Sequence, residues 1–298
     1  MRSETVLLLA ASFGFGATWP TRNVRSELQS RRGLPTVELT KLYRRGEPDT
    51  GDDLPDDPDH PNKLDQVETA FKDAIELASY VLDFIDTDND VLPHYFDPGD
   101  RAEIKRIFST VSNGGKGNDM LSDLLVQTTD SNNECGGSTL SYLKNGEKDA
   151  EDTPYIVLCP NAFKKKAVTE LKGKDLQADD AHKYYAACKQ DGGEIDDHVT
   201  YLMNTLGMTL LHEYMHYDKM IDSAFGSITD NPQGKAGYGP VNVYDKLDKK
   251  LARVNADSYA YYASQVLWTT LCQTKDFEAP RPGIDDKDPD CGGEACKD

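Results

Sequence analysis

Two histidines and a glutamate stand at a spacing that can bind a metal ion and use it. The stretch Thr209–Tyr217 contains His212-Glu213-x-x-His216, in an apolar segment that we expect to be helical from about Thr200 to Ile221. On an α-helix, residues four apart share a face and lie roughly 6 Å apart. Both imidazoles can therefore coordinate one ion, at about 2.0–2.1 Å if it is zinc. Glu213 would lie where a base takes a proton from a metal-bound water.

The alternative is an amphipathic helix whose two histidines are surface or core residues without a metal. Leu206, Leu210, Leu211 and Met215 make the helix apolar around the pair. Unpaired imidazoles in that setting would lose hydration without a compensating partner. A chain with six histidines would contain this motif by chance in roughly one case in a hundred. We therefore favour a metal site, and a zinc-dependent hydrolase is the working hypothesis.

A catalytic zinc needs a third protein ligand and leaves its fourth position to water. Asp222 lies six residues after His216, as in H-E-x-x-H-x-x-G-x-x-D sites, but Lys219 stands where that turn normally has glycine. Asp230 lies farther along and is followed by Gly237-Tyr238-Gly239. On spacing alone, both aspartates remain candidates.

Composition limits the partners of the protein. A chain of 298 residues is long enough for a substantial core. The formal net charge of −19 argues against nucleic acid and anionic membranes, because both would repel the chain. We expect protein or peptide substrates and a monomer.

The amino terminus is typical of an exported protein. A short basic start precedes an apolar run from Thr5 to Ala17, which is shorter than the roughly 20 residues of a membrane span. We expect residues 1–17 to be a signal peptide, with a buried amino-terminal segment as the alternative. The six cysteines favour disulfides and secretion, although their pairing does not follow from sequence.

Residues 18–62 are expected to be a disordered leader. The segment 22–45 is basic and contains the pairs Arg31-Arg32 and Arg44-Arg45, whereas 47–61 is acidic and rich in proline. Such a composition cannot bury enough apolar surface to fold by itself. It is either a propeptide cut after a dibasic pair or a flexible arm.

Periodicity and turn residues place the remaining elements. We expect helices over 64–85, 101–111, 162–171, 179–188 and 241–268. Strands are expected over 138–143 and 155–159, joined by a polar hairpin loop. Asp196 and Asp197 stand where the cap of the His212 helix is expected. The order predicts an α+β fold over residues 63–272, mostly helical with a small sheet, followed by an acidic tail at 273–298.

Four segments together resemble the aspzincins, the deuterolysin-like secreted zinc endopeptidases of fungi. They are Ile156–Pro160, Leu211–His216, Ile228-x-Asp230 with Tyr238-Gly239, and Asn255–Ala260. The resemblance covers roughly residues 64–272 and implies a zincin-like fold. One feature departs from the family pattern. The family spaces its aspartate and tyrosine as D-x-x-Y-G, whereas seven residues separate Asp230 from Tyr238 here.

The resemblance implies roles for individual residues. His212, His216 and Asp230 would bind zinc, Glu213 would be the general base, and Tyr238 would assist at the oxyanion. These roles favour Asp230 over the other aspartate as the third ligand. A catalytically inactive, exported zinc-fold binding protein is the alternative, because the spacing of Asp230 and Tyr238 is altered.

The resemblance also implies substrate contacts and disulfides. The strand with Ile156 and Val157 would pair with an extended substrate backbone. Asp257 would either hold the active-site helix or attract a lysine of the substrate, as acidic residues of this region do in some family members. The pairings implied are Cys135–Cys159 and Cys188–Cys272.

Overall fold

Helix α7 carries the His212 motif, and two longer helices and a small sheet hold it in place. The computed structural model describes residues 49–50, 63–113, 120–145, 153–168, 188, 195, 197–234, 237–272, 274 and 276–286, all within the unit Tyr43–Asp298. The expected signal peptide, most of the expected leader, the helix expected over 179–188 apart from Cys188, and Cys291 and Cys296 lie outside these residues.

Seven α-helices occur in the described part of the chain. They are α3 (Lys63–Phe84), α4 (Leu92–Tyr95), α5 (Arg101–Ser112), α7 (Leu206–Met215), α8 (Asp218–Ile221), α9 (Lys249–Ala252) and α10 (Ala256–Leu271). Helices α3 and α5 confirm the helices expected over 64–85 and 101–111. The mixture of helices with a small sheet confirms the α+β class. No helix among the described residues is both long and apolar enough to span a membrane.

The sheet contains strands β1 (Asp49–Thr50), β2 (Leu125–Gln127), β3 (Ser141–Lys144) and β4 (Tyr155–Leu158). Their order is β1-β2-β4-β3, with β3 antiparallel to β4 and the other pairs parallel. The two expected strands are confirmed, and β3 lies at the edge of the sheet. Strand β1 comes from the segment expected to be a disordered leader, so at least these two residues belong to the domain.

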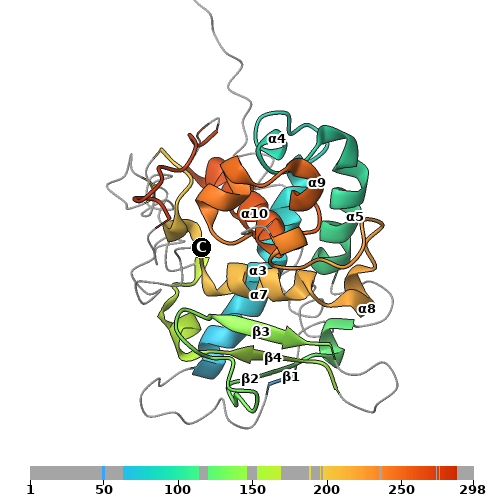
Figure 1. Cartoon of the computed structure of the whole chain (residues 1–298), viewed down its shortest axis with the longest axis vertical. Helices are drawn as coiled ribbons and strands as arrows, with labels where there is room; N and C mark the ends of the chain where they lie inside the picture. The colour runs from blue at the N-terminus through green and yellow to red at the C-terminus, as the bar shows by residue number, and fades with distance from the viewer. Residues whose placement is uncertain are drawn as a thin grey trace, which may run out of the picture. The chain divides into compact units, whose positions relative to one another are not determined.

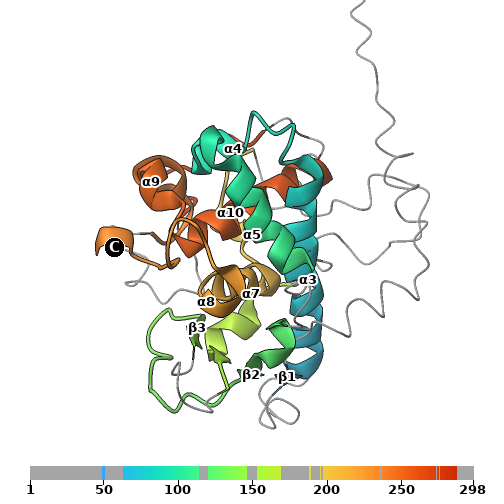
Figure 2. The same cartoon turned by 90° about the vertical axis from the view of Figure 1, so that its right-hand side faces the viewer.

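Helix α7 lies between the sheet and the helices α4, α9 and α10 in both views (Figures 1 and 2). It packs closely on α3 at Gly207, where an added Cβ would lie 2.3 Å from the Cβ of Asp73. A larger residue at 207 would therefore separate the two helices. The Asp73 carboxylate is buried and accepts a hydrogen bond from the Val168 backbone.

The expected continuous helix over Thr200–Ile221 is wrong in its extent. The segment Tyr201–Met203 is a separate 3₁₀ turn, and α7 begins only after Thr205, whose hydroxyl accepts from the Met208 backbone. Thr205 is therefore the cap, and the cap expected at Asp196 and Asp197 is also wrong. The Asp197 carbonyl instead accepts from the Glu278 backbone.

The helix expected over Val241–Trp268 is also interrupted. It consists of a π-helical turn at Asn242–Lys246, then α9, then α10. The Asp248 side chain caps α9, which accounts for the first break. Beyond α10, part of the stretch expected to be a tail packs on the domain, where Phe277 and Asp285 are buried.

Both expected disulfides are present. Cys135–Cys159 joins the segment before β3 to the end of β4, and Cys188–Cys272 reaches the end of α10. Disulfides persist in extracellular or other oxidising compartments.

Candidate metal centre

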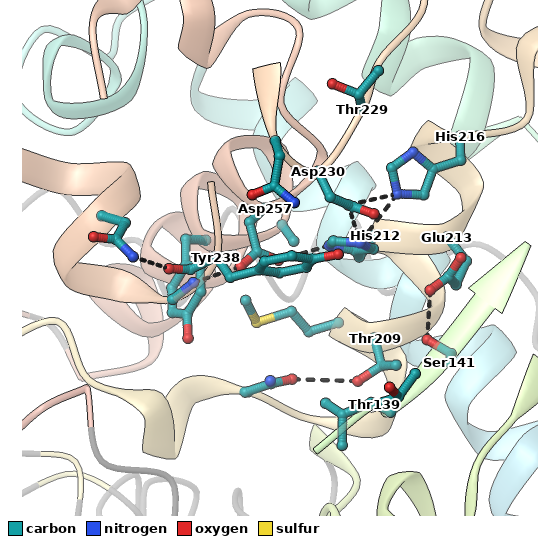
Figure 3. A pocket seen from close by; sticks show the side chains of 18 of the residues that line it. Thr139, Ser141, Thr209, His212, Glu213, His216, Thr229, Asp230, Tyr238 and Asp257 are labelled. Carbon is teal, nitrogen blue, oxygen red and sulfur yellow. Dashed lines mark hydrogen bonds and ion pairs between the residues drawn. The ribbon is translucent and has the colours of Figure 1, made fainter. Parts of the chain in front are cut away.

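Three side-chain atoms converge at the end of α7. The Nε2 atoms of His212 and His216 lie 3.2 Å apart, and Asp230 Oδ1 lies 2.9 Å from the first and 2.8 Å from the second (Figure 3). His216 is the cap residue at the carboxyl end of α7, and Asp230 follows in the loop beyond α8. These are the three residues of the described chain that could hold a metal ion together.

The hydrogen bonds on the far side of each ring fit a metal at this point. His216 Nδ1 lies 2.9 Å from the Ile228 carbonyl, and His212 Nδ1 lies 2.6 Å from Asp257 Oδ1. Both partners only accept hydrogen bonds, so each Nδ1 carries the proton and each Nε2 of a neutral ring presents a lone pair. With no proton on either Nε2, two lone pairs and a carboxylate oxygen at these distances could hold one cation between them. With a proton there, the same Nε2 donates a hydrogen bond to Asp230 Oδ1. A tetrahedral zinc site spaces its ligand atoms by about 3.3 Å, close to what is found here.

Charges around the site favour that cation. Burial opposes protonation of His212, but the Asp257 and Asp230 carboxylates outweigh burial and hold the His212 pKa well above its ordinary value. Burial opposes ionisation of Asp230, but hydrogen bonds from His212 and His216 outweigh it and hold the Asp230 pKa far below its ordinary range. The carboxylate is therefore ionised at neutral pH, as a metal ligand must be.

Glu213 lies beside these ligands with its carboxylate buried. Only 2% of the residue is exposed, and its Oε1 accepts a hydrogen bond of 2.6 Å from the Ser141 hydroxyl on β3. The second oxygen, Oε2, has no partner in the described part of the chain. Burial raises the pKa of Glu213, and the charges of His212 and His216 oppose that rise. A raised pKa suits a carboxylate that must take up a proton and release it again.

Tyr238 covers the other side of the cluster. Its ring stacks on His212, with centroids 6.0 Å apart and planes inclined by 14°, and its hydroxyl points toward the ligands (Figure 3). Burial of the hydroxyl and the nearby Asp230 carboxylate raise the pKa of Tyr238, so the phenol stays protonated and able to donate. The residue is 48% exposed, which leaves its outer edge open to the cleft.

Asp257 has a structural role here, because each of its carboxylate oxygens is engaged in a hydrogen bond. Oδ1 holds His212 Nδ1, and Oδ2 accepts a 2.7 Å hydrogen bond from the Gly239 backbone. Asp257 also lines the cleft, so its contact with substrate stays a prediction. The alternative, that it holds the active-site helix, agrees with the structure.

Ile156 and Val157 are wrongly predicted as substrate contacts. Both are fully buried, and both edges of their strand β4 are already paired, with β2 and β3. Of the two edge strands of the described sheet, β1 and β3, it is β3 that contacts α7 and lines the cleft. Alternation within β4 could not reveal this, because strand order depends on pairing partners distant in sequence.

Asp222 lies apart from the cluster. It caps the end of α8 in a left-handed conformation with φ of 37°, and its carbonyl accepts a hydrogen bond from Arg106 on α5. It does not line the cleft that contains the two histidines. The structure thus brings His212, Glu213, His216, Asp230 and Tyr238 together and leaves Asp222 outside.

The cleft has a volume of about 1520 Å³ and extends well beyond the metal ligands. One wall is β3 with the residues before it, and another comes from the segment after α10, through Gly283 and Asp286. Sequence reasoning missed Ser141, Gly283 and Asp286 as cleft residues. None of them belongs to a recognisable motif.

Comparison with known proteins adds no family assignment. No protein-family model matches the chain, and no curated protein matches it significantly in sequence.

Proposed function

We propose that the protein is a secreted zinc endopeptidase of the aspzincin type, with a zincin-like fold. The observation that carries the proposal is the convergence of His212 Nε2, His216 Nε2 and Asp230 Oδ1 beside the buried carboxylate of Glu213. Two neutral imidazoles and one carboxylate form a ligand set typical of catalytic zinc. When bound, zinc would supply a Lewis acid that polarises a carbonyl and makes hydroxide available at neutral pH.

The side chains of the chain supply the proton transfers. Glu213 would take the proton of the attacking water on its unpaired Oε2, then pass it to the leaving amine. Ser141 keeps the other oxygen of the carboxylate in place. The Tyr238 hydroxyl would donate a hydrogen bond to the oxyanion that develops on the scissile carbonyl. No covalent acyl-enzyme is needed.

The cleft favours an extended polypeptide as substrate. Strand β3 is the edge strand of the sheet beside the site, and an extended peptide can add to such an edge through backbone hydrogen bonds. The cleft is lined by many residues besides the metal ligands, which favours a long substrate and cleavage within a chain.

The test is zinc stoichiometry measured together with hydrolysis of casein, before and after chelation with phenanthroline. We expect one zinc per chain, with activity lost on chelation and restored by zinc. One zinc without activity on casein or on a peptide library would favour the exported binding protein instead, and absence of zinc would refute the metal site. Amino-terminal sequencing of protein from the culture medium tests secretion and processing.

A further inference from the structure

Asn255 is a fully buried amide at the start of α10. Its Nδ2 donates to the Gly237 carbonyl at 2.9 Å and to the Ser258 hydroxyl at 3.0 Å. Gly237 directly precedes Tyr238 in the chain. The side chain of Asn255 therefore holds the residue next to the tyrosine that covers the metal ligands.

The backbone around Asn255 holds a second part of the site. The Thr229 N–H donates to the Val254 carbonyl at 2.9 Å, and the Ala256 N–H donates to the Thr229 carbonyl at 3.0 Å. Thr229 directly precedes Asp230. The isolated β-bridge between Thr229 and Asn255 therefore fixes the backbone immediately before Asp230, the third candidate ligand.

These two attachments meet at Gly237. A Cβ added there would lie 2.0 Å from Asn255 Oδ1 and 2.1 Å from the Asp230 carbonyl. The backbone at 237 therefore lies directly against Asp230, although the two are seven positions apart in the sequence. Only glycine permits this approach. We call the contact of Asp230, Gly237 and Asn255 the neck.

The first turn of α10 completes the arrangement. Asp257 holds both the His212 ring and the Gly239 backbone, so α10 contacts the chain on either side of Tyr238. Without the neck, the backbone at Gly237 and Tyr238 would not be fixed relative to Asp230, and ordering it would cost entropy in each catalytic cycle.

We propose that Asn255 is a positioning residue: by holding Gly237 against Asp230 in the neck, it sets the Tyr238 hydroxyl toward the metal ligands. The inference rests on the proposed function for its catalytic consequence, but the neck itself is a structural statement. The neck explains how Tyr238 reaches the site although more residues separate it from Asp230 than in the family pattern.

Hydrogen exchange tests the neck independently of activity. In the full chain, Asn255→Ala should speed amide exchange in peptides covering 229–240 by about tenfold or more, with exchange in α3 unchanged. Ser258→Ala is the matched control, because it removes the other partner of Asn255 Nδ2 and keeps the bond to Gly237. Unchanged exchange in Asn255→Ala would overturn the proposal. If that variant fails to unfold cooperatively, Gly237→Ala gives the same test, since its methyl group forces the neck apart.

A double-mutant cycle tests the positioning role. Asn255→Ala should lower kcat about tenfold or more with KM little changed, and should have an effect of less than about threefold in a Tyr238→Phe background. Equal effects in both backgrounds would show that Asn255 acts on stability alone and overturn the positioning role. A wild-type protein without peptidase activity would refute the proposed function, while the exchange experiment would still decide whether the neck exists.

Discussion

The hydroxyl of Ser141 donates a 2.6 Å hydrogen bond to Glu213 Oε1 and so connects the edge strand β3 to helix α7. The strand proposed to pair with a peptide therefore also fixes the carboxylate proposed as the base. A substrate that docks on β3 would be placed relative to Glu213 by the same element.

Replacing Ser141 by alanine should lower kcat by about tenfold and leave zinc content unchanged. A hydrogen bond to a charged group contributes about 1.5–3 kcal/mol, and its loss would let the Glu213 carboxylate leave its position. Ser141→Thr is the matched control, because it keeps the hydroxyl. Steady-state kinetics with a fluorogenic peptide gives the measurement, and a Ser141→Ala enzyme with wild-type kcat would exclude a role for this hydrogen bond.

Replacing Glu213 by glutamine should preserve metal binding and remove nearly all turnover. The amide keeps the size of the side chain but cannot accept the proton, and general base catalysis contributes roughly 10²–10⁴-fold. Zinc analysis and casein hydrolysis on the same preparation check both parts. Normal turnover in this variant would refute the proposed mechanism.

The two aspartates considered for the third ligand can be separated by a matched pair of asparagine variants. Asp230→Asn should weaken zinc binding by at least about hundredfold, because it removes the only charge among the three converging atoms. Asp222→Asn should leave zinc affinity unchanged, and asparagine tolerates the left-handed backbone found at that position. Competition with a chromogenic chelator measures both affinities. If Asp222→Asn weakened zinc binding and Asp230→Asn did not, Asp222 would be the third ligand.

The sequence was sufficient to predict the parts of the site that depend on local spacing. His212 and His216 lie one helical turn apart, and Glu213 projects beside them, whatever the rest of the chain does. The periodicity of 64–85 and 101–111 was strong enough to predict α3 and α5, because each has one clearly apolar face.

The errors concern contacts between distant segments. Nothing in the sequence around Ile156 indicates that β2 and β3 flank its strand on both sides. The sequence also does not show that His212 and Gly239 both bond to Asp257, because the three residues meet only in the folded chain. The apparent helix over Val241–Trp268 was misleading because apolar residues continue through breaks set by the Asp248 cap.

The segment after α10 should contribute to stability through Asp285 in a pH-dependent way. The carboxylate accepts from the Arg281 backbone at 2.6 Å and from the Arg281 side chain at 2.7 and 2.9 Å, and the Asp285 carbonyl accepts from the Tyr201 backbone at 2.9 Å. Burial opposes ionisation of Asp285, but the hydrogen bonds from Arg281 outweigh it and lower the pKa of the carboxyl group.

Because the pKa is lower in the folded protein, the ionised carboxylate stabilises the fold above its unfolded pKa of about 3.9, and the contribution is lost as pH falls through the folded pKa. Asp285→Asn should therefore lower the free energy of unfolding at pH 7 by about 1–3 kcal/mol, with the difference from wild type shrinking below about pH 4. Urea unfolding at several pH values measures this. Asp286→Asn is the matched control for a charge removed from the same segment, since it keeps the bonds from Arg281 to Asp285. If the difference in unfolding free energy between Asp285→Asn and the wild type stayed constant down to pH 3, the ionised Asp285 carboxylate would not be its source.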